Sequence, residues 1–241
     1  MEFISGKGQS KRDEESLNIL FTSLGFNVKI HQYLTAQQMI TNVESYSEMQ
    51  HEGVFLLIIL SLGTLVDNQV AVLGTDNKAV KIHHLETLFH ASSCSSLIGI
   101  PKIFLIDAFQ DDKNLIPEYT ESMATKQSLA CPDRTDMWDF AIIYTLTFEY
   151  VAHATNSGSW FTQIIVKVIT EAIPCISFTK IIQEVKARVQ RSNTHQMVEC
   201  VDRLTRDYFI KRYISLLNSK LTKNLINSLL SVAHLWQKFK S

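Results

Sequence analysis

The chain has 241 residues, of which 46% are hydrophobic and 20% are charged, enough for one large domain or two small ones. A net charge of −1 at pH 7 gives no overall attraction to nucleic acid. The four cysteines lack the CxxC spacing of a zinc site, so we expect free thiols, no metal, no cofactor and a cytoplasmic location. Met1 to Asp13 is mostly polar, so we expect neither a signal peptide nor a membrane-spanning helix.

The first half of the chain alternates helical and strand patterns. Leu17, Leu20, Phe21 and Leu24 share one helical face that ends at Gly25, a residue suited to a left-handed cap. The strand "FNVKIH" and the helix "TAQQMITNVESY" follow. The runs "VFLLIIL" and "IPKIFLI" are continuously apolar, as in strands covered by helices on both faces. Between them, "HHLETLFHASSC" predicts a short amphipathic helix.

The second half begins with a polar stretch, Gln110–Met137, which contains two prolines and little periodicity and is expected to be a linker. After it come a buried strand, "DFAIIYTL", two helices, "SWFTQIIVKVITEA" and "FTKIIQEVKARVQR", and a strand, "MVECVDRL". The sequence therefore predicts an α/β fold with a mainly parallel central sheet and helices on both faces.

In open α/β sheets, functional residues gather where the parallel strands end. Here those places read "ILSLG", Leu60–Gly63, and "IDAFQDD", Ile106–Asp112. Their order and flanking sequence resemble the caspase family, whose chain carries a Ser-His-Gly turn and, about 50 residues later, a Gln-Ala-Cys-Arg-Gly turn. The resemblance runs from roughly Asp13 to Phe209 and includes the string "GSWF".

The resemblance implies that both catalytic positions are altered. Leu62 stands in the histidine slot, before Gly63, and Phe109 stands in the cysteine slot. The family's Gln and Arg around the cysteine are replaced by Asp107 and Gln110. A cysteine peptidase needs a thiolate and a nearby imidazole, and losing one member of such a pair costs a factor of about 10⁶. We therefore expect a catalytically inactive pseudoenzyme.

The resemblance also implies a degraded substrate pocket. Where the family has an arginine in a Ser-Trp-Arg string, the matching positions are Ala152, His153 and Ala154. A substrate carboxylate would find no bidentate cation there, and Asp107 would place an acid where the substrate's acid comes.

The regions that the resemblance implies are a large-subunit-like region (1–112), an intersubunit-like linker (113–137), a small-subunit-like region (138–212) and a C-terminal extension (213–241).

An active peptidase with relocated residues is the less favoured alternative. We expect His153 to be a noncatalytic loop histidine and Cys94 to be a packing cysteine. His83, His84 and His90 do not share one helical face cleanly, which favours a solvated helix start over a metal site.

Two features depart from the family. The family has a hydrophobic strand before its first helix, whereas only Phe3 and Ile4 are apolar candidates here, so we expect the first central strand to be missing. Residues 213–241 are basic, and their apolar residues recur every three or four positions, at Leu217, Leu221, Leu225, Leu229, Val232, Trp236 and Phe239. Such an amphipathic helix packs onto its own domain or binds a membrane surface, scaffold or partner groove.

The resemblance favours a regulator of apoptosis that forms a heterodimer with an active caspase, or pairs with itself, and binds no nucleic acid. Family domains pair through the last strand of the small region, which here corresponds to Val198, Glu199, Cys200, Val201, Asp202 and Arg203. The sequence leaves open which caspase is bound and whether the effect is activating or inhibiting.

Overall fold

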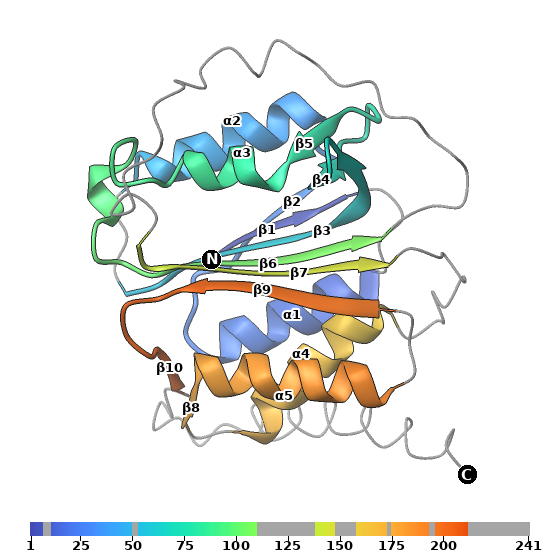
Figure 1. The fold of residues 1–241 in the computed structure, drawn as a ribbon, viewed down its shortest axis with the longest axis vertical. Helices are drawn as coiled ribbons and strands as arrows, with labels where there is room; N and C mark the ends of the chain where they lie inside the picture. Colours follow the sequence, from blue (N-terminus) through green and yellow to red (C-terminus); the bar gives the residue numbers. More distant parts are fainter. Residues whose placement is uncertain are drawn as a thin grey trace.

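The computed structural model describes residues 1–6, 11–49, 53–109, 138–147, 158–172, 175–192 and 196–211. Figure 1 shows a central sheet between two layers of helices. The sheet's main strands are β1 (Glu2–Ser5), β2 (Lys29–Gln32), β3 (Phe55–Val66), β6 (Lys102–Phe109), β7 (Phe140–Thr147) and β9 (Gln196–Arg203). Their order is β2-β1-β3-β6-β7-β9. All neighbours are parallel except β7 and β9, which confirms the predicted fold class.

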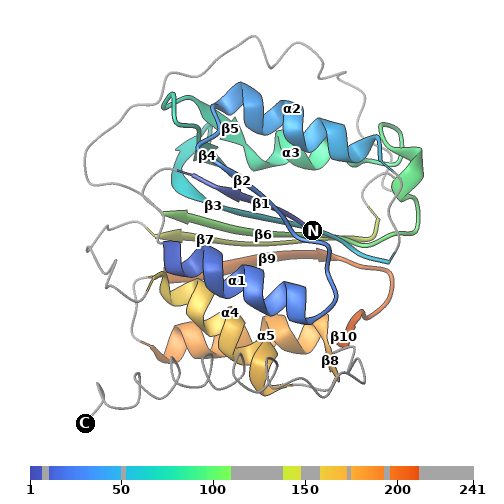
Figure 2. The ribbon, with the colours of Figure 1, turned by 180° about the vertical axis from the view of Figure 1, so that it is seen from behind.

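The helices lie on both faces of this sheet. Figure 2 shows α1 (Lys11–Ser23) on the same face as α4 (Trp160–Glu171) and α5 (Phe178–Arg191). The opposite face is covered by α2 (Ala36–Ser47) and α3 (Ile82–Thr87). Smaller elements are β4 (Gln69–Leu73), β5 (Ala79–Lys81), the 3-10 turn η1 (Ser95–Leu97), and the antiparallel pair β8 (Cys175–Ser177) and β10 (Phe209–Lys211).

Short polar side chains fix the helix starts. Thr35 caps α2 and forms a capping box with Gln38. Ser159 caps α4 and Ser177 caps α5. Gly25, at φ 87°, follows α1 in the left-handed conformation. The predicted helix "HHLETLFHASSC" is shorter than expected, because α3 ends at Thr87.

Strand β3 explains why the apolar runs are continuous. Leu56, Ile58 and Leu60 belong to the hydrophobic cluster beneath α1, α4 and α5. Their neighbours Phe55, Leu57 and Ile59 belong to the cluster beneath α2 and α3. Successive side chains of a strand point to opposite faces, so a strand between two helix layers is apolar at every position.

The expected absence of the first central strand is wrong. Strand β1 lies between β2 and β3 and is parallel to both. Phe3 and Ile4 are each 1% exposed and enter opposite clusters. The sequence signal was weak because the strand has only four residues and its ends, Glu2 and Ser5, are polar although both are buried.

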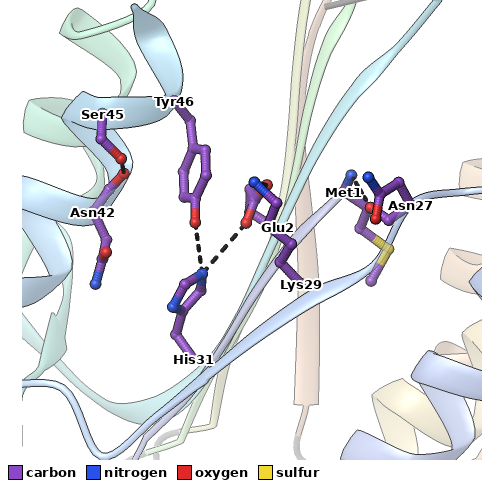
Figure 3. A network of polar contacts seen from close by, with 8 residues as sticks. All are labelled: Met1, Glu2, Asn27, Lys29, His31, Asn42, Ser45 and Tyr46. Atoms are coloured by element: carbon purple, nitrogen blue, oxygen red, sulfur yellow. Dashed lines mark hydrogen bonds and ion pairs between the residues drawn. The ribbon is translucent and has the colours of Figure 1, made fainter. Parts of the chain in front are cut away.

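Polar contacts from β2 and α2 compensate for burying Glu2 (Figure 3). The Oε2 atom of Glu2 lies 3.4 Å from Nε2 of His31, and its Oε1 atom lies 3.9 Å from Nζ of Lys29. The same His31 nitrogen lies 2.6 Å from the hydroxyl oxygen of Tyr46. Burial and the neighbouring Glu2 raise the pKa of Tyr46, so this phenol stays protonated. A buried carboxylate needs such partners, and they lie far from it in the sequence.

Among the described residues, no helix is long and apolar enough to cross a membrane. Their cysteines, Cys94, Cys175 and Cys200, are free thiols, as predicted.

Candidate functional site at the strand tips

Strands β3 and β6 bring the two predicted catalytic slots together. Their parallel register pairs Leu62 with Phe109 and Ser61 with Ala108. Leu62 is 7% exposed and packs in a small cluster with Ala71 and Leu73 of β4. A leucine and a phenylalanine offer neither a nucleophile nor a proton acceptor, so these two positions provide no peptidase chemistry.

The backbone at the strand tips is closely packed. A Cβ on Gly63 would lie 2.5 Å from Cβ of Ala108, and a Cβ on Gly6 would lie 2.0 Å from Oγ of Ser61. The amide of Gly6 donates to the carbonyl of Leu60 at 2.7 Å. Glycine is therefore required at both positions by the neighbouring strand.

Asp107 is an interior residue. Its side chain is 1% exposed, and its Oδ1 accepts the hydroxyl proton of Thr145 at 2.7 Å. Its Oδ2 accepts a short hydrogen bond from Oγ of Ser159. Burial raises the pKa of Asp107, and the two hydroxyl donors oppose this shift. This acid was expected where the substrate's acid comes, whereas its carboxyl lies in the interior and is bonded to β7 and to the start of α4.

A second buried acid, Asp13 of α1, shares the same serine. Its Oδ2 accepts the backbone N–H of Ser159 at 2.8 Å, and its side chain is 2% exposed. Burial raises the pKa of Asp13 to about 7. The hydrogen bond from the Ser159 amide opposes this rise in pKa, and the charge of Asp107 adds to the rise. A Cβ on Gly158 would lie 2.1 Å from Oδ1 of Asp13, so the glycine of "GSWF" makes room for this carboxyl.

The Asp13–Ser159–Asp107 cluster was not predicted from the sequence. Ser159 opens the predicted helix "SWFTQIIVKVITEA", but no pattern in the sequence indicated its two acidic partners. The Ser159 hydroxyl also accepts the amide of Thr162 at 3.2 Å. A hydroxyl held between a helix start and a buried carboxyl stabilises structure, and these contacts include no imidazole to activate it.

The other candidate residues include a cysteine and a histidine that are both buried. Cys94 is 3% exposed and donates to the carbonyl of Ser47 at 2.6 Å, which confirms a packing role. His90 is buried edge-on to Phe140, so the expected solvated position is wrong for this histidine. Among the described residues, no His, Cys, Asp and Glu group could hold a metal ion. Gln110, His153, Ala154, the linker and the C-terminal extension lie outside the described residues.

The predicted interface strand, β9, ends the sheet's main path. It pairs antiparallel with β7 on one side, with Val201 opposite Ile142. Along it, Glu199, Val201 and Asp202 are exposed, whereas Val198, Cys200 and Arg203 are half-buried. Arg203 is fixed by an ion pair of 2.7 Å with Glu86 of α3, and Tyr144 donates a short hydrogen bond to Glu199.

Comparison with known proteins gives consistent matches. A family model described as a caspase domain matches residues 5–209. Caspase-6 of Mus musculus is 27% identical over 227 residues, which cover 88% of this chain and 78% of the relative. Caspase-6 of Gallus gallus is 26% identical, with 88% and 71% covered. Caspase-8 of Rattus norvegicus is 29% identical over 67% of this chain and 35% of the relative.

Proposed function

Because the chain belongs to the caspase family, we propose that it is a catalytically inactive member that regulates an active caspase by pairing with it through β9. The regulated process would be apoptosis. The observation that carries this proposal is the position of β9, an eight-residue strand at the end of the sheet's main path. Such an edge presents backbone N–H and C=O groups that can pair with another chain.

Inactivity is supported by the chemistry at the strand tips. Leu62 and Phe109 lie side by side in the register of β3 and β6, where the family's base and nucleophile are expected. Asp107, in the slot of the family's glutamine, is occupied by Thr145 and Ser159. These bonds hold the carboxyl inside the protein, so it does not replace the missing groups.

Pairing is supported by the exposed apolar residue on β9. In an antiparallel pair of two such strands with its two-fold axis at Val201, this side chain, 37% exposed, would be covered at the centre. Glu199 would face Arg203 of the other strand, but both already have partners in their own domain, Tyr144 and Glu86, so the contact at Val201 carries the argument. A partner caspase with a similar terminal strand would be accommodated by the same edge.

The effect on the partner follows from linkage. If the chain binds the competent conformation of the caspase more tightly than the incompetent one, it activates that caspase, and with the opposite preference it inhibits. A coupling free energy of about 1–3 kcal/mol corresponds to a 5- to 150-fold change in that equilibrium. The sign of this change is read directly from the titration described next.

The test is a titration of this chain into purified active caspases while cleavage of an aspartate-containing reporter peptide is followed. Val201→Lys places a charge at the centre of the proposed interface. Ile98→Lys is the matched control, because Ile98 is an exposed apolar residue, 64% accessible, outside β9. We expect the wild type and Ile98→Lys to change the cleavage rate at stoichiometric ratios, and Val201→Lys to have no effect.

Two results would contradict the proposal. If no caspase responds to the wild type, pairing with an active caspase is wrong. If Val201→Lys acts as strongly as the wild type, the interaction uses a different surface. Light scattering of the chain alone distinguishes self-pairing, which Val201→Lys should also abolish.

A further inference from the structure

Among the described residues, apolar side chains line a partly open cavity at the end of the sheet opposite the strand tips. Its volume is about 470 Å³. The sheet side is formed by Leu56, Ile103 and Ile143, near the starts of β3, β6 and β7. The opposite side includes Ile165 of α4 and Ile181 of α5. This size falls in the range of pockets that bind ligands.

The cavity is open where the described chain ends. Most of its lining is buried, but Phe209 is 57% exposed, and Phe26, Val54, Tyr208 and Ile210 are only partly buried. Three of these are consecutive residues, 208–210, at β10. Thirty further residues, 212–241, continue directly from this strand. The opening of the cavity and the start of that segment are therefore adjacent.

We propose that residues 212–241 fold back onto their own domain and place Leu217, Leu221 and Leu225 in this cavity. These leucines recur at every fourth position and would share one face of a helix. An engineered apolar cavity of about 150 Å³ is large enough to hold a benzene molecule. A cavity of about 470 Å³ therefore has room for several apolar side chains.

The short connection favours this occupant. Leu217 follows the last described residue, Lys211, by only a few positions, so the segment is present at an effective concentration in the millimolar range. A free apolar ligand or a second chain must bind from dilute solution and lose translational freedom. The charge of Lys223 is compatible with this arrangement, because on a helix it would lie on the face opposite Leu221 and could stay in solvent.

The proposal is independent of pairing through β9, which lies at the edge of the sheet. The test is hydrogen exchange measured by mass spectrometry on the full chain. Leu221→Lys places a charge on the leucine face, and Ser219→Lys places the same charge on the opposite face. We expect Leu221→Lys alone to accelerate exchange about tenfold or more in the segments around Phe26, Val54 and Ile210, because these would lose their cover.

A second measurement uses the dye ANS, whose fluorescence rises when it binds exposed apolar surface. We expect Leu221→Lys to increase the signal several-fold over the wild type and over Ser219→Lys. A synthetic peptide of residues 212–241, added to Leu221→Lys, should restore slow exchange and displace the dye. Circular dichroism verifies that both variants remain folded.

Three outcomes would overturn the proposal. Equal exchange and equal dye binding in the two variants would mean that the leucine face does not cover the cavity. Protection that disappears on dilution of the wild type would make a second copy the occupant. Sedimentation of the wild type with anionic vesicles, lost in Leu221→Lys while exchange around the cavity is unchanged, would assign the leucine face to a membrane.

Discussion

The tips of β3 and β6 differ from the edge strand β9 in how many side chains remain exposed to another molecule. At the tips, two glycines allow the backbones to approach closely, and the polar groups of Asp107 and Ser159 are bound to one another. Along β9, Glu199, Val201 and Asp202 remain exposed. The two regions are built from different strands, so in the regulator that we propose the residues at the tips can change without altering the edge at β9.

The largest expected effect concerns peptidase activity at the tips. We expect the wild type to cleave an aspartate-containing peptide at least about 10⁶-fold more slowly than an active caspase, because both the nucleophile and its base are replaced. The measurement is peptide turnover, combined with mass spectrometry after treatment with a caspase-directed electrophile. Cys175→Ser controls for labelling of that exposed thiol. Turnover together with one specific cysteine adduct would contradict the prediction.

The next effect is a pH-dependent stability from Asp13. Its pKa is raised to about 7 in the folded state, whereas in an unfolded chain it is about 3.9. Between these values the folded state binds the extra proton, so stability falls as the pH rises from about 4 to 7 and then levels off. Over this pH range, Asp13 lowers the free energy of unfolding by an amount on the order of 4 kcal/mol.

Urea unfolding of Asp13→Asn between pH 4 and 8 measures this contribution. We expect the stability of Asp13→Asn to decline less steeply with pH than that of the wild type. Part of the decline should remain, because the pKa of Asp107 is also raised. Glu15→Gln, at an exposed position of the same helix, should retain the wild-type profile. If Asp13→Asn keeps the full decline, the Asp13–Ser159–Asp107 cluster does not control it.

A smaller effect is expected from Gly63→Ala. Its new Cβ would lie 2.5 Å from Cβ of Ala108, and such overpacking costs about 1–3 kcal/mol. Chemical unfolding measures the loss. The double variant Gly63→Ala/Ala108→Gly removes the clashing methyl group and should recover part of it. Equal stabilities of the single and double variants would argue against close packing as the cause.

The smallest effect on stability is expected at the edge strand. Val201→Lys should change the free energy of unfolding of the monomer by no more than about 0.5 kcal/mol, because this side chain is exposed. Thermal unfolding at low protein concentration is the measurement. A large destabilisation would show that Val201 supports its own domain, and the two regions would then be less distinct than we argue.

The sequence predicted the elements whose pattern repeats over many residues. The continuous apolar runs of β3 and β6 predicted helices on both faces of the sheet. The amphipathic patterns of α4 and α5 predicted helices that cover one of these faces. Strand β1 was missed because Glu2 looks like a surface residue, and its stabilising contacts come from β2 and α2. Local patterns do not show such distant compensation.

The candidate site was predicted in part. The slots of Leu62 and Phe109 could be found because each follows an apolar run, and the register places them together. The partners of Asp107 could not, because Thr145 and Ser159 are distant in sequence and resemble ordinary strand and cap residues. The apolar cavity could not be predicted from the sequence either, because it depends on the distance between the sheet and the helices packed on it.

The pairing of β6 with β7 has a consequence for a chain that has been cut. These strands belong to the two regions on either side of residues 113–137, and they are joined in register from Lys102 with Phe140 to Phe109 with Thr147. The contact of Asp13 with Ser159 is a second connection between the regions. A proteolytic nick between them would therefore leave two fragments that migrate as one particle under native conditions and separate only in denaturant.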